Sequence, residues 1–178
     1  MVGSAGALPV ILAQLNKLTS PNEGVLFVAY HRVDLPEFRL EKFAPRCAPQ
    51  ILRAMTGHKV EASFVYYPDG AQDLTVSRGR LRTSRSAARH HPNLDRLLGS
   101  LAAEYGARVT AILLSGMARD GLAGLEAVRK AGGRVIVQSP GSSSFPQLLE
   151  AAIAAGLGDS TLDLPEIHAL VSQTLAGS

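Results

Sequence analysis

The chain has one cysteine and no tryptophan, and aromatic residues make up only 5% of its 178 residues. A single cysteine, Cys47, excludes an internal disulfide framework and a zinc site with four thiolate ligands. It also suits a reducing compartment, so we expect a cytoplasmic protein. With 46% hydrophobic residues the chain can still bury a large core of aliphatic side chains, and its length favours one domain over residues 1–178.

Features of membrane and exported proteins are also missing. No apolar run is long enough to cross a bilayer, and the first residues do not show a basic segment followed by an apolar one. We therefore expect neither membrane insertion nor export.

The net charge of +3 is too small to indicate nucleic-acid binding by the whole molecule. Positive charge is nevertheless concentrated in one segment, which also lacks the aromatic residues that stack on bases, so no nucleic-acid partner is predicted. The segment is either a solvated hairpin with outward arginines or a basic strip that faces an acidic partner. Its basic residues are Arg78, Arg80, Arg82, Arg85, Arg89, His90 and His91.

Apolar strand patterns alternate with helical ones along most of the chain. This alternation predicts an α/β fold with an open, mostly parallel, doubly wound sheet of the Rossmann-like, three-layer type, accompanied by a small antiparallel hairpin. Strands are expected at 24–30, 108–114 and 134–138, and helices at 8–18, 94–105 with Asn93 as N-cap, 122–131, 145–156 and 165–175.

The stretch between residues 32 and 83 gives weaker signals. Prolines interrupt the part up to residue 61, where we expect loops and brief helices, including a short one at 38–43. Short apolar runs at 62–67, 73–76 and 80–83 are separated by turn residues, which is typical of antiparallel hairpins beside a parallel sheet.

Three residues that together can perform acyl transfer each follow an expected strand or begin an expected helix. Ser4 lies in a glycine-containing turn before the first helix, His31 follows the strand at 24–30, and Asp120 follows the strand at 108–114. The carboxyl ends of parallel strands meet at one edge of a sheet, so these side chains are expected to converge. A serine hydroxyl becomes a strong nucleophile when an imidazole accepts its proton, and a carboxylate fixes the tautomer of that imidazole. Backbone N–H groups at the start of the helix would stabilise an oxyanion.

Each of these residues also has a purely structural interpretation. Ser4 can cap its helix, His31 can be a hydrogen-bonded loop residue, and Asp120 can cap the helix that follows it. The glycine turn lacks the full fingerprint of a dinucleotide-binding loop. No cysteine or carboxylate cluster completes a metal site around His90 and His91, so no metal or cofactor is expected.

Four segments, in this order and spacing, resemble the catalytic domain of the chemotaxis protein-glutamate methylesterase (CheB) family. The likeness covers nearly the whole chain, and Gly-Met-x-x-Asp-Gly followed by Gln138 is its most specific part. The segments are Gly3-Ser4-Ala5-Gly6, the strand that ends in Tyr30-His31, Arg89-His90-His91-Pro92-Asn93-Leu94-Asp95, and Leu114-Ser115-Gly116-Met117-Ala118-Arg119-Asp120-Gly121.

The resemblance implies a hydrolase that removes methyl groups from γ-glutamyl methyl esters on the cytoplasmic helices of methyl-accepting chemoreceptors and releases methanol. Some family members also deamidate receptor glutamines. It implies Ser4 as nucleophile, His31 as general base and Asp120 as the residue that orients it. Ala5, Met117 and His90 would lie next to the oxyanion or the substrate. Receptor methylation helices are acidic, which gives the basic strip a rationale.

The sequence departs from the family pattern in four places. Only Met1-Val2-Gly3 precedes the serine where the family has a complete strand, Ala7 and Ala118 replace glycines, and the loop 139–146 is altered and looks shortened. No receiver domain precedes the catalytic region, so we expect no regulation or regulation by a separate protein. These departures keep two alternatives open: a catalytically weakened module that binds receptors or signalling partners without turnover, and an esterase of small molecules.

Overall fold

The computed structural model describes residues 1–19, 23–31, 39–69, 72–87 and 92–176. Its central feature is a parallel sheet whose strand order is β10-β9-β8-β1-β3. Two short strands, β1 (Val2–Gly3) and β3 (Ala29–Tyr30), lie side by side. The longer strands β8 (Thr110–Leu113) and β9 (Arg134–Gln138) continue the sheet toward β10 (Ser160–Leu162).

A second parallel sheet extends the first one. It contains β2 (Val25–Phe27), β5 (Phe64–Tyr67) and β4 (Gln50–Arg53), in the order β2-β5-β4. Because β2 and β3 follow each other with only Val28 between them, one extended segment pairs first with β5 and then with β1. The remaining strands, β6 (Gln72–Ser77) and β7 (Arg80–Arg85), form an antiparallel hairpin.

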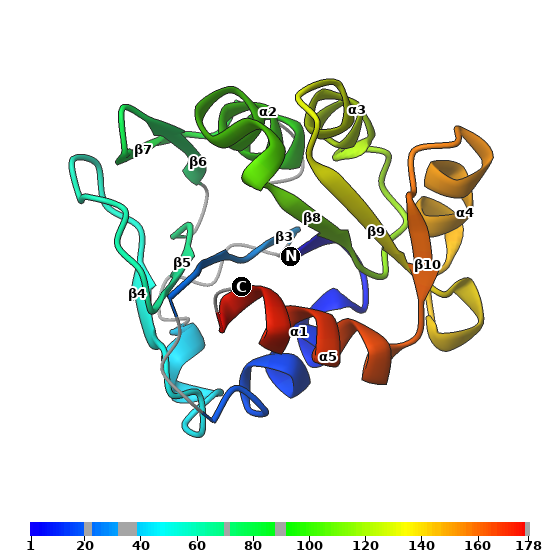
Figure 1. Ribbon diagram of the computed structural model, residues 1–178, viewed down its shortest axis with the longest axis horizontal. Coiled ribbons are helices and arrows are strands. Elements are labelled where there is room, and N and C mark those ends of the chain that lie inside the picture. The colour runs from blue at the N-terminus through cyan, green and yellow to red at the C-terminus, as the bar shows by residue number, and fades with distance from the viewer. Residues whose placement is uncertain (20–22, 32–38, 70–71, 88–91, 177–178) are drawn as a thin grey trace.

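Helices cover both faces of the sheet (Figure 1). Helices α2 (Leu94–Tyr105), α3 (Leu122–Lys130) and α4 (Gln147–Ala154) pack over one core cluster, and α1 (Ala7–Leu15) and α5 (Leu164–Leu175) pack over the other. Single turns of 3₁₀ helix lie at Leu40–Lys42, Gly106–Arg108 and Pro140–Ser142.

Strand β8 illustrates why the sheet is buried on both faces. Side chains alternate along a strand, so Ala111 and Leu113 point into the first cluster and Ile112 and Leu114 into the second. All four are less than 5% exposed. A near-continuous apolar run is therefore what the centre of this three-layer fold requires.

The predicted fold class is confirmed, and several local predictions are corrected. The run at 62–67 is not part of an antiparallel hairpin, because β5 pairs in parallel with both β2 and β4. Strand β4 lies where only loops and brief helices were expected, and β10 was not predicted. Both strands contain polar residues and are half-buried edge strands, so they lack the apolar run of a central strand.

Candidate active site

The structure brings Ser4, His31 and Asp120 together at the carboxyl edge of the central sheet. Each follows a different strand: Ser4 comes after β1, His31 after β3, and Asp120 belongs to the segment between β8 and α3. The Ser4 Oγ lies 3.2 Å from His31 Nδ1. His31 Nε2 lies 2.8 Å from Asp120 Oδ2. A hydroxyl, an imidazole and a carboxylate thus form one continuous hydrogen-bonded chain.

Ser4 is held by the turn that joins β1 to α1. Its N–H donates to the Ser115 carbonyl at 2.8 Å, and its own carbonyl accepts the Ala7 N–H at 3.1 Å. The N-cap residue of α1 is Gly6, with φ 76° and no side-chain cap bond, so the Ser4 hydroxyl does not serve as the helix cap. The hydroxyl is instead directed to His31.

His31 owes its position to the pairing of β3 with β1. Its backbone N–H donates to the Gly3 carbonyl at 3.1 Å, which continues the parallel ladder by one residue and sets the imidazole beside Ser4. The side chain is only 6% exposed. When Nε2 carries the proton and donates it to Asp120, Nδ1 has a lone pair that accepts the Ser4 hydroxyl.

Asp120 is fixed by two backbone donors as well as by His31. The N–H groups of Leu94 and Asp95, in the first turn of α2, donate to its two carboxylate oxygens at 2.7 and 3.2 Å. Burial on its own would raise the pKa of Asp120, but the hydrogen bond from His31 and the two N–H donors outweigh burial and hold this pKa below its usual value. The carboxylate is therefore kept ionised, as an orienting group requires.

Asp95 makes the reciprocal contacts. Its Oδ1 accepts the N–H groups of Gly121 at 3.0 Å and Gly124 at 2.6 Å, at the start of α3. Burial, together with the neighbouring Asp120 carboxylate, raises the pKa of Asp95. Asp120 therefore caps the helix that precedes it in sequence, α2, and the expected cap on the following helix comes from Asp95.

A further acid steadies the start of α2. Asp73, on β6, is 2% exposed. It accepts hydrogen bonds from the Asn93 N–H at 2.8 Å and from the Arg96 guanidinium at 2.7 Å. Asn93 in turn caps the helix by accepting the Arg96 N–H at 2.8 Å, as its position predicted. The sequence reasoning did not assign a role to Asp73 or Asp95; an acid inside an apolar strand and an acid in the first helical turn were the available signals.

The residues expected beside the substrate have different outcomes. Ala5 lies in the turn directly after Ser4, and its carbonyl accepts the Ser115 hydroxyl at 2.8 Å. Met117 is 57% exposed and follows Gly116, whose Cα lies so close to Ser4 that an added Cβ would be 2.8 Å from the serine Cβ. His90 lies outside the described residues, as do Arg89 and His91.

The short first strand still places the serine. Ala7, which stands where a glycine was expected, is fully buried and packs against Gly3, where an added Cβ would lie 2.5 Å from the Ala7 Cβ. The methyl group at residue 7 is thus accommodated by a glycine opposite it.

The altered loop after Gln138 is tied to the segment that follows β8, because the Gly116 N–H donates to the Phe145 carbonyl at 2.9 Å.

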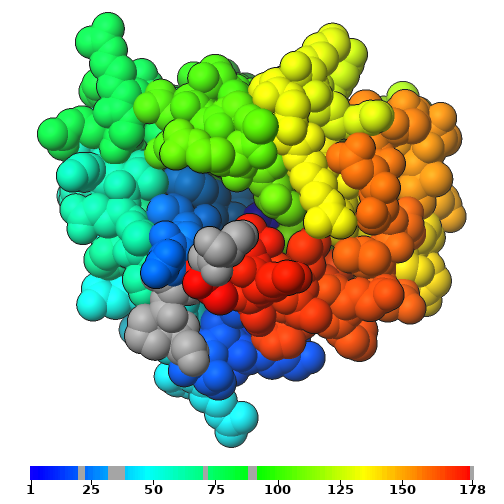
Figure 2. Space-filling view, viewed as in Figure 1, coloured from blue at the N-terminus to red at the C-terminus, as the bar shows by residue number. Residues whose placement is uncertain are grey.

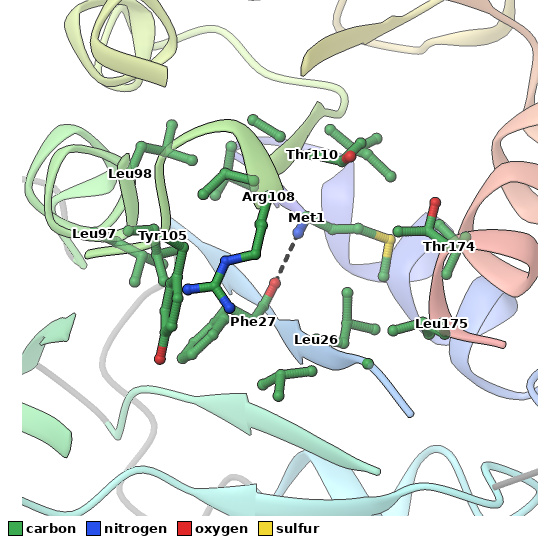
Figure 3. Close-up of a pocket in the computed structure, with 18 of the residues that line it drawn as sticks. Met1, Leu26, Phe27, Leu97, Leu98, Tyr105, Arg108, Thr110, Thr174 and Leu175 are labelled. Atoms are coloured by element: carbon green, nitrogen blue, oxygen red, sulfur yellow. Dashed lines mark hydrogen bonds between the residues drawn. The ribbon is translucent and has the colours of Figure 1, made fainter. Parts of the chain in front are cut away.

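A cavity of about 440 Å³ lies elsewhere, at the amino edge of the sheet. In Figure 2 it is the hollow between α2, β2 and α5, and Figure 3 shows the Met1 amine donating to the Phe27 carbonyl inside it. Burial lowers the pKa of this amine to about 5. The residues that line the cavity are mainly apolar, and Ser4, His31 and Asp120 are not among them.

Neither a metal cluster nor a membrane span is found in the described part of the chain. Within it, the structure has no group of three or more histidine, cysteine, aspartate or glutamate residues placed to hold a metal ion. Across the same residues, none of the helices combines the length and the apolar character needed to span a membrane.

Comparisons with known proteins agree with this geometry. A 33% identical relative, protein-glutamate methylesterase/protein-glutamine glutaminase 2 of Cereibacter sphaeroides, aligns with 93% of this chain and 47% of its own length. The Myxococcus xanthus protein numbered 3 under the same name is 30% identical over 98% of this chain and 50% of its own length. The chain thus spans about half the length of the curated relatives it matches.

The fold has a solved counterpart in the Thermotoga maritima CheB methylesterase catalytic domain. The two share 22% identity and a TM-score of 0.77, over 97% of this chain and 95% of the other. The model of the CheB methylesterase family matches residues 1–171. With nearly its whole length covered by that model, the chain belongs to the CheB methylesterase family.

Proposed function

We propose that this chain hydrolyses γ-glutamyl methyl esters on the cytoplasmic helices of methyl-accepting chemoreceptors, with Ser4, His31 and Asp120 as its catalytic triad. The observation that carries the proposal is the hydrogen-bonded chain from the Ser4 hydroxyl through both nitrogens of His31 to the Asp120 carboxylate. Membership of the methylesterase family supports the ester as the bond that is cleaved.

The reaction begins when the Ser4 Oγ attacks the ester carbonyl carbon while His31 Nδ1 takes its proton. Collapse of the tetrahedral intermediate breaks the bond to the methoxy oxygen, which leaves as methanol with the proton from His31. Water then attacks the acyl-serine, again losing a proton to His31. Release of the glutamate carboxylate restores the Ser4 hydroxyl. Asp120 accepts a hydrogen bond from the Nε2–H of His31 throughout, and its negative charge stabilises the imidazolium.

The oxyanion would be stabilised in the turn that leads into α1, next to the positive end of the helix dipole. The first N–H groups of a helix have no partner within the helix and carry the positive end of its dipole. Ala5 directly follows the nucleophile, and its carbonyl is turned toward Ser115. We assign its N–H as an oxyanion donor, with Met117 on the exposed segment beside the scissile ester.

Three arginines of the basic strip lie on β7, and we propose them as a docking surface for the substrate. Arg80 and Arg82 are exposed on the face of the strand opposite the buried Leu81. Arg85 is exposed at the open end of the hairpin, where it pairs with Gln72. The residue after Gln72 is Asp73, which contacts the start of α2. The first N–H groups of α2 bind Asp120, so this end of the hairpin is linked to the site. We place the acidic receptor helix along β7, with one methyl ester at Ser4.

The substrate is tested by charge reversal at the strip. Arg82→Glu should raise the KM for a methylated, acidic receptor helix severalfold and leave the hydrolysis of a small neutral methyl ester unchanged, and added salt should weaken the difference. Arg134→Glu is the matched control, because Arg134 is exposed at the amino end of β9, at the opposite edge of the sheet. Equal KM values for Arg82→Glu and wild type would contradict receptor docking on this strip.

Activity on the two substrates separates the remaining alternatives. Hydrolysis of the small ester without hydrolysis of the receptor ester would favour the small-molecule esterase. Receptor binding without hydrolysis of either would favour the module that binds without turnover. The intact contacts of His31 with Ser4 and Asp120 support turnover.

A further inference from the structure

Ser115 connects the nucleophile turn to the rest of the sheet through three hydrogen bonds. It directly follows the apolar run of β8 and is 2% exposed. Its carbonyl accepts the Ser4 N–H at 2.8 Å, and its hydroxyl donates to the Ala5 carbonyl at 2.8 Å. Its own N–H donates to Gln138 Oε1 at 3.0 Å. One buried residue therefore holds the Gly3–Ser4 and the Ala5–Gly6 peptide units, one on each side of the Ser4–Ala5 peptide.

The hydroxyl of Ser115 has a defined orientation because a second serine lies behind it. Ser143 Oγ donates to Ser115 Oγ at 2.9 Å and accepts the Phe145 N–H at 3.1 Å. Each hydroxyl has one proton, so the chain runs in a single direction, from Ser143 to Ser115 and on to the Ala5 carbonyl. Neither hydroxyl can rotate away without losing a partner.

Gln138 anchors the other side of Ser115. The side chain is fully buried at the end of β9, where its Oε1 accepts the Ser115 N–H. Its Nε2 donates to the Ser142 carbonyl at 3.0 Å and lies 3.2 Å from the Ser142 hydroxyl. The same amide therefore ties the segment after β8 to the loop that contains Ser143.

This network supplements the pairing of β1 with β3, because the other side of the nucleophile turn has few strand contacts. Strand β1 has only two residues, and its pairing with β8 is limited to Val2 opposite Leu113. The start of α1 has no side-chain cap. There is also no room for the turn to move toward the loop, since a Cβ on Gly6 would lie 2.8 Å from the Ser115 hydroxyl.

We propose that Ser115, held by Ser143 and Gln138, is the positioning residue that sets the attack geometry of Ser4. Ser115 does not touch the substrate. It determines where Ser4 lies relative to His31, and by holding the Gly3–Ser4 and Ala5–Gly6 peptides it restrains the Ser4–Ala5 peptide between them, whose N–H is the proposed oxyanion donor. This inference rests on the proposed role of Ser4 as the nucleophile.

The test uses the whole chain and two readouts. The first is the rate at which a fluorophosphonate labels Ser4, with Ser4→Ala as the blank; this rate depends on nucleophile geometry and on no assumption about the natural ester. The second is kcat and KM for a methyl ester. Ser115→Ala leaves the Ala5 carbonyl and the Ser143 hydroxyl without their partner, and should lower both the labelling rate and kcat by roughly tenfold or more, with KM within about twofold.

Ser143→Ala is a second test of the network that remains informative if Ser115→Ala does not fold. Ser143 is only half-buried, so this change should keep the melting temperature and still lower the labelling rate, by a smaller factor than Ser115→Ala. Ser143→Thr keeps the hydroxyl and should restore the rate. Ser144→Ala is the matched control, an exposed serine in the same loop.

Each outcome has one meaning. Unchanged labelling in both Ser115→Ala and Ser143→Ala, with wild-type melting temperatures, overturns the positioning role. So does an equal loss in Ser144→Ala. The wild type could also label well and yet hydrolyse no receptor ester. If Ser115→Ala and Ser143→Ala then label more slowly than this wild type, the positioning role is supported and only the proposed substrate is wrong.

Discussion

Asp95 and Asp120 cap each other's helices. Asp120 accepts the N–H groups of Leu94 and Asp95 at the start of α2, and Asp95 accepts those of Gly121 and Gly124 at the start of α3. The exchange joins two helices through the carboxylate that also holds His31. The position of His31 therefore depends on how α2 packs against α3. Asp120 contacts both His31 and α2, whereas Asp95 contacts the start of α3, so substitutions at the two acids should affect activity and stability differently.

Asp120→Asn should abolish most of the activity. The amide has the size of the carboxylate but can present an N–H to His31 Nε2, which favours the tautomer whose Nδ1 cannot accept the serine proton. A kcat lower by about 10⁴-fold is expected for loss of the correct tautomer, with KM little changed. Steady-state kinetics on a methyl ester measures it, with circular dichroism as the check on folding.

The two acids should also affect stability with opposite dependence on pH. The folded-state pKa of Asp120 is lowered, so its ionisation stabilises the fold above the unfolded value of about 3.8, and this contribution is lost as the pH falls below it. The folded-state pKa of Asp95 is raised, so its ionisation costs stability as the pH rises through and above 3.8.

Urea unfolding at several pH values between about 3 and 7 measures this difference. Relative to wild type, Asp120→Asn should lose stability toward neutral pH, and Asp95→Asn should gain it. Parallel pH profiles for the two variants would contradict the assigned pKa shifts.

Gly3→Ala should destabilise the fold and displace Ser4. Its Cβ would lie 2.5 Å from the Ala7 Cβ and 3.1 Å from the Ser115 carbonyl oxygen, which binds the Ser4 N–H. Overpacking of this kind costs about 2 kcal/mol. The double variant Gly3→Ala/Ala7→Gly removes the first clash and should recover much of that loss. Chemical denaturation of the four proteins of this cycle measures the coupling, and purely additive effects would show that Gly3 and Ala7 do not constrain each other.

The cavity at the amino edge of the sheet should accept a continuation of β1. It lies between β2 and β8 and ends at the Met1 amine, which donates to the Phe27 carbonyl as a strand N–H would. An engineered extension of four valines before Met1 would bury apolar side chains there and replace the amine with a peptide N–H. Each buried valine contributes about 1.5 kcal/mol or more, so the melting temperature should rise by several degrees.

A Gly-Ser extension of equal length is the control for the valine extension. It supplies the peptide bond but no apolar side chains, so its effect on the melting temperature should be clearly smaller. Equal shifts for the two extensions would show that the cavity does not take up the added side chains.

Much of this molecule could be predicted from the sequence, for identifiable physical reasons. Long buried elements such as β8 and α2 give strong periodic patterns. Parallel strands also bring the residues at their carboxyl ends to one edge of the sheet, so Ser4, His31 and Asp120 could be grouped from the sequence alone. The parallel pairing of β5 was missed because a strand four residues long carries no sign of its partner's direction.

The supporting contacts of the site were also beyond the sequence. The exchange of caps between Asp95 and Asp120 depends on how α2 packs against α3, and the network around Ser115 joins residues far apart in the chain. The sequence offers Asp120 as a cap for the helix that follows it, α3, but the structure shows that Asp120 caps α2. Local spacing cannot show which helix start lies nearest in space.

The most direct test of the catalytic assignment is methanol release from a methylated receptor cytoplasmic domain by the wild-type chain, Ser4→Ala and Ser144→Ala. We predict release by the wild type and by Ser144→Ala at similar rates, and no release above the uncatalysed background by Ser4→Ala, whose circular dichroism spectrum should match that of the wild type. Equal release by Ser4→Ala and the wild type would contradict the assignment of Ser4 as the nucleophile.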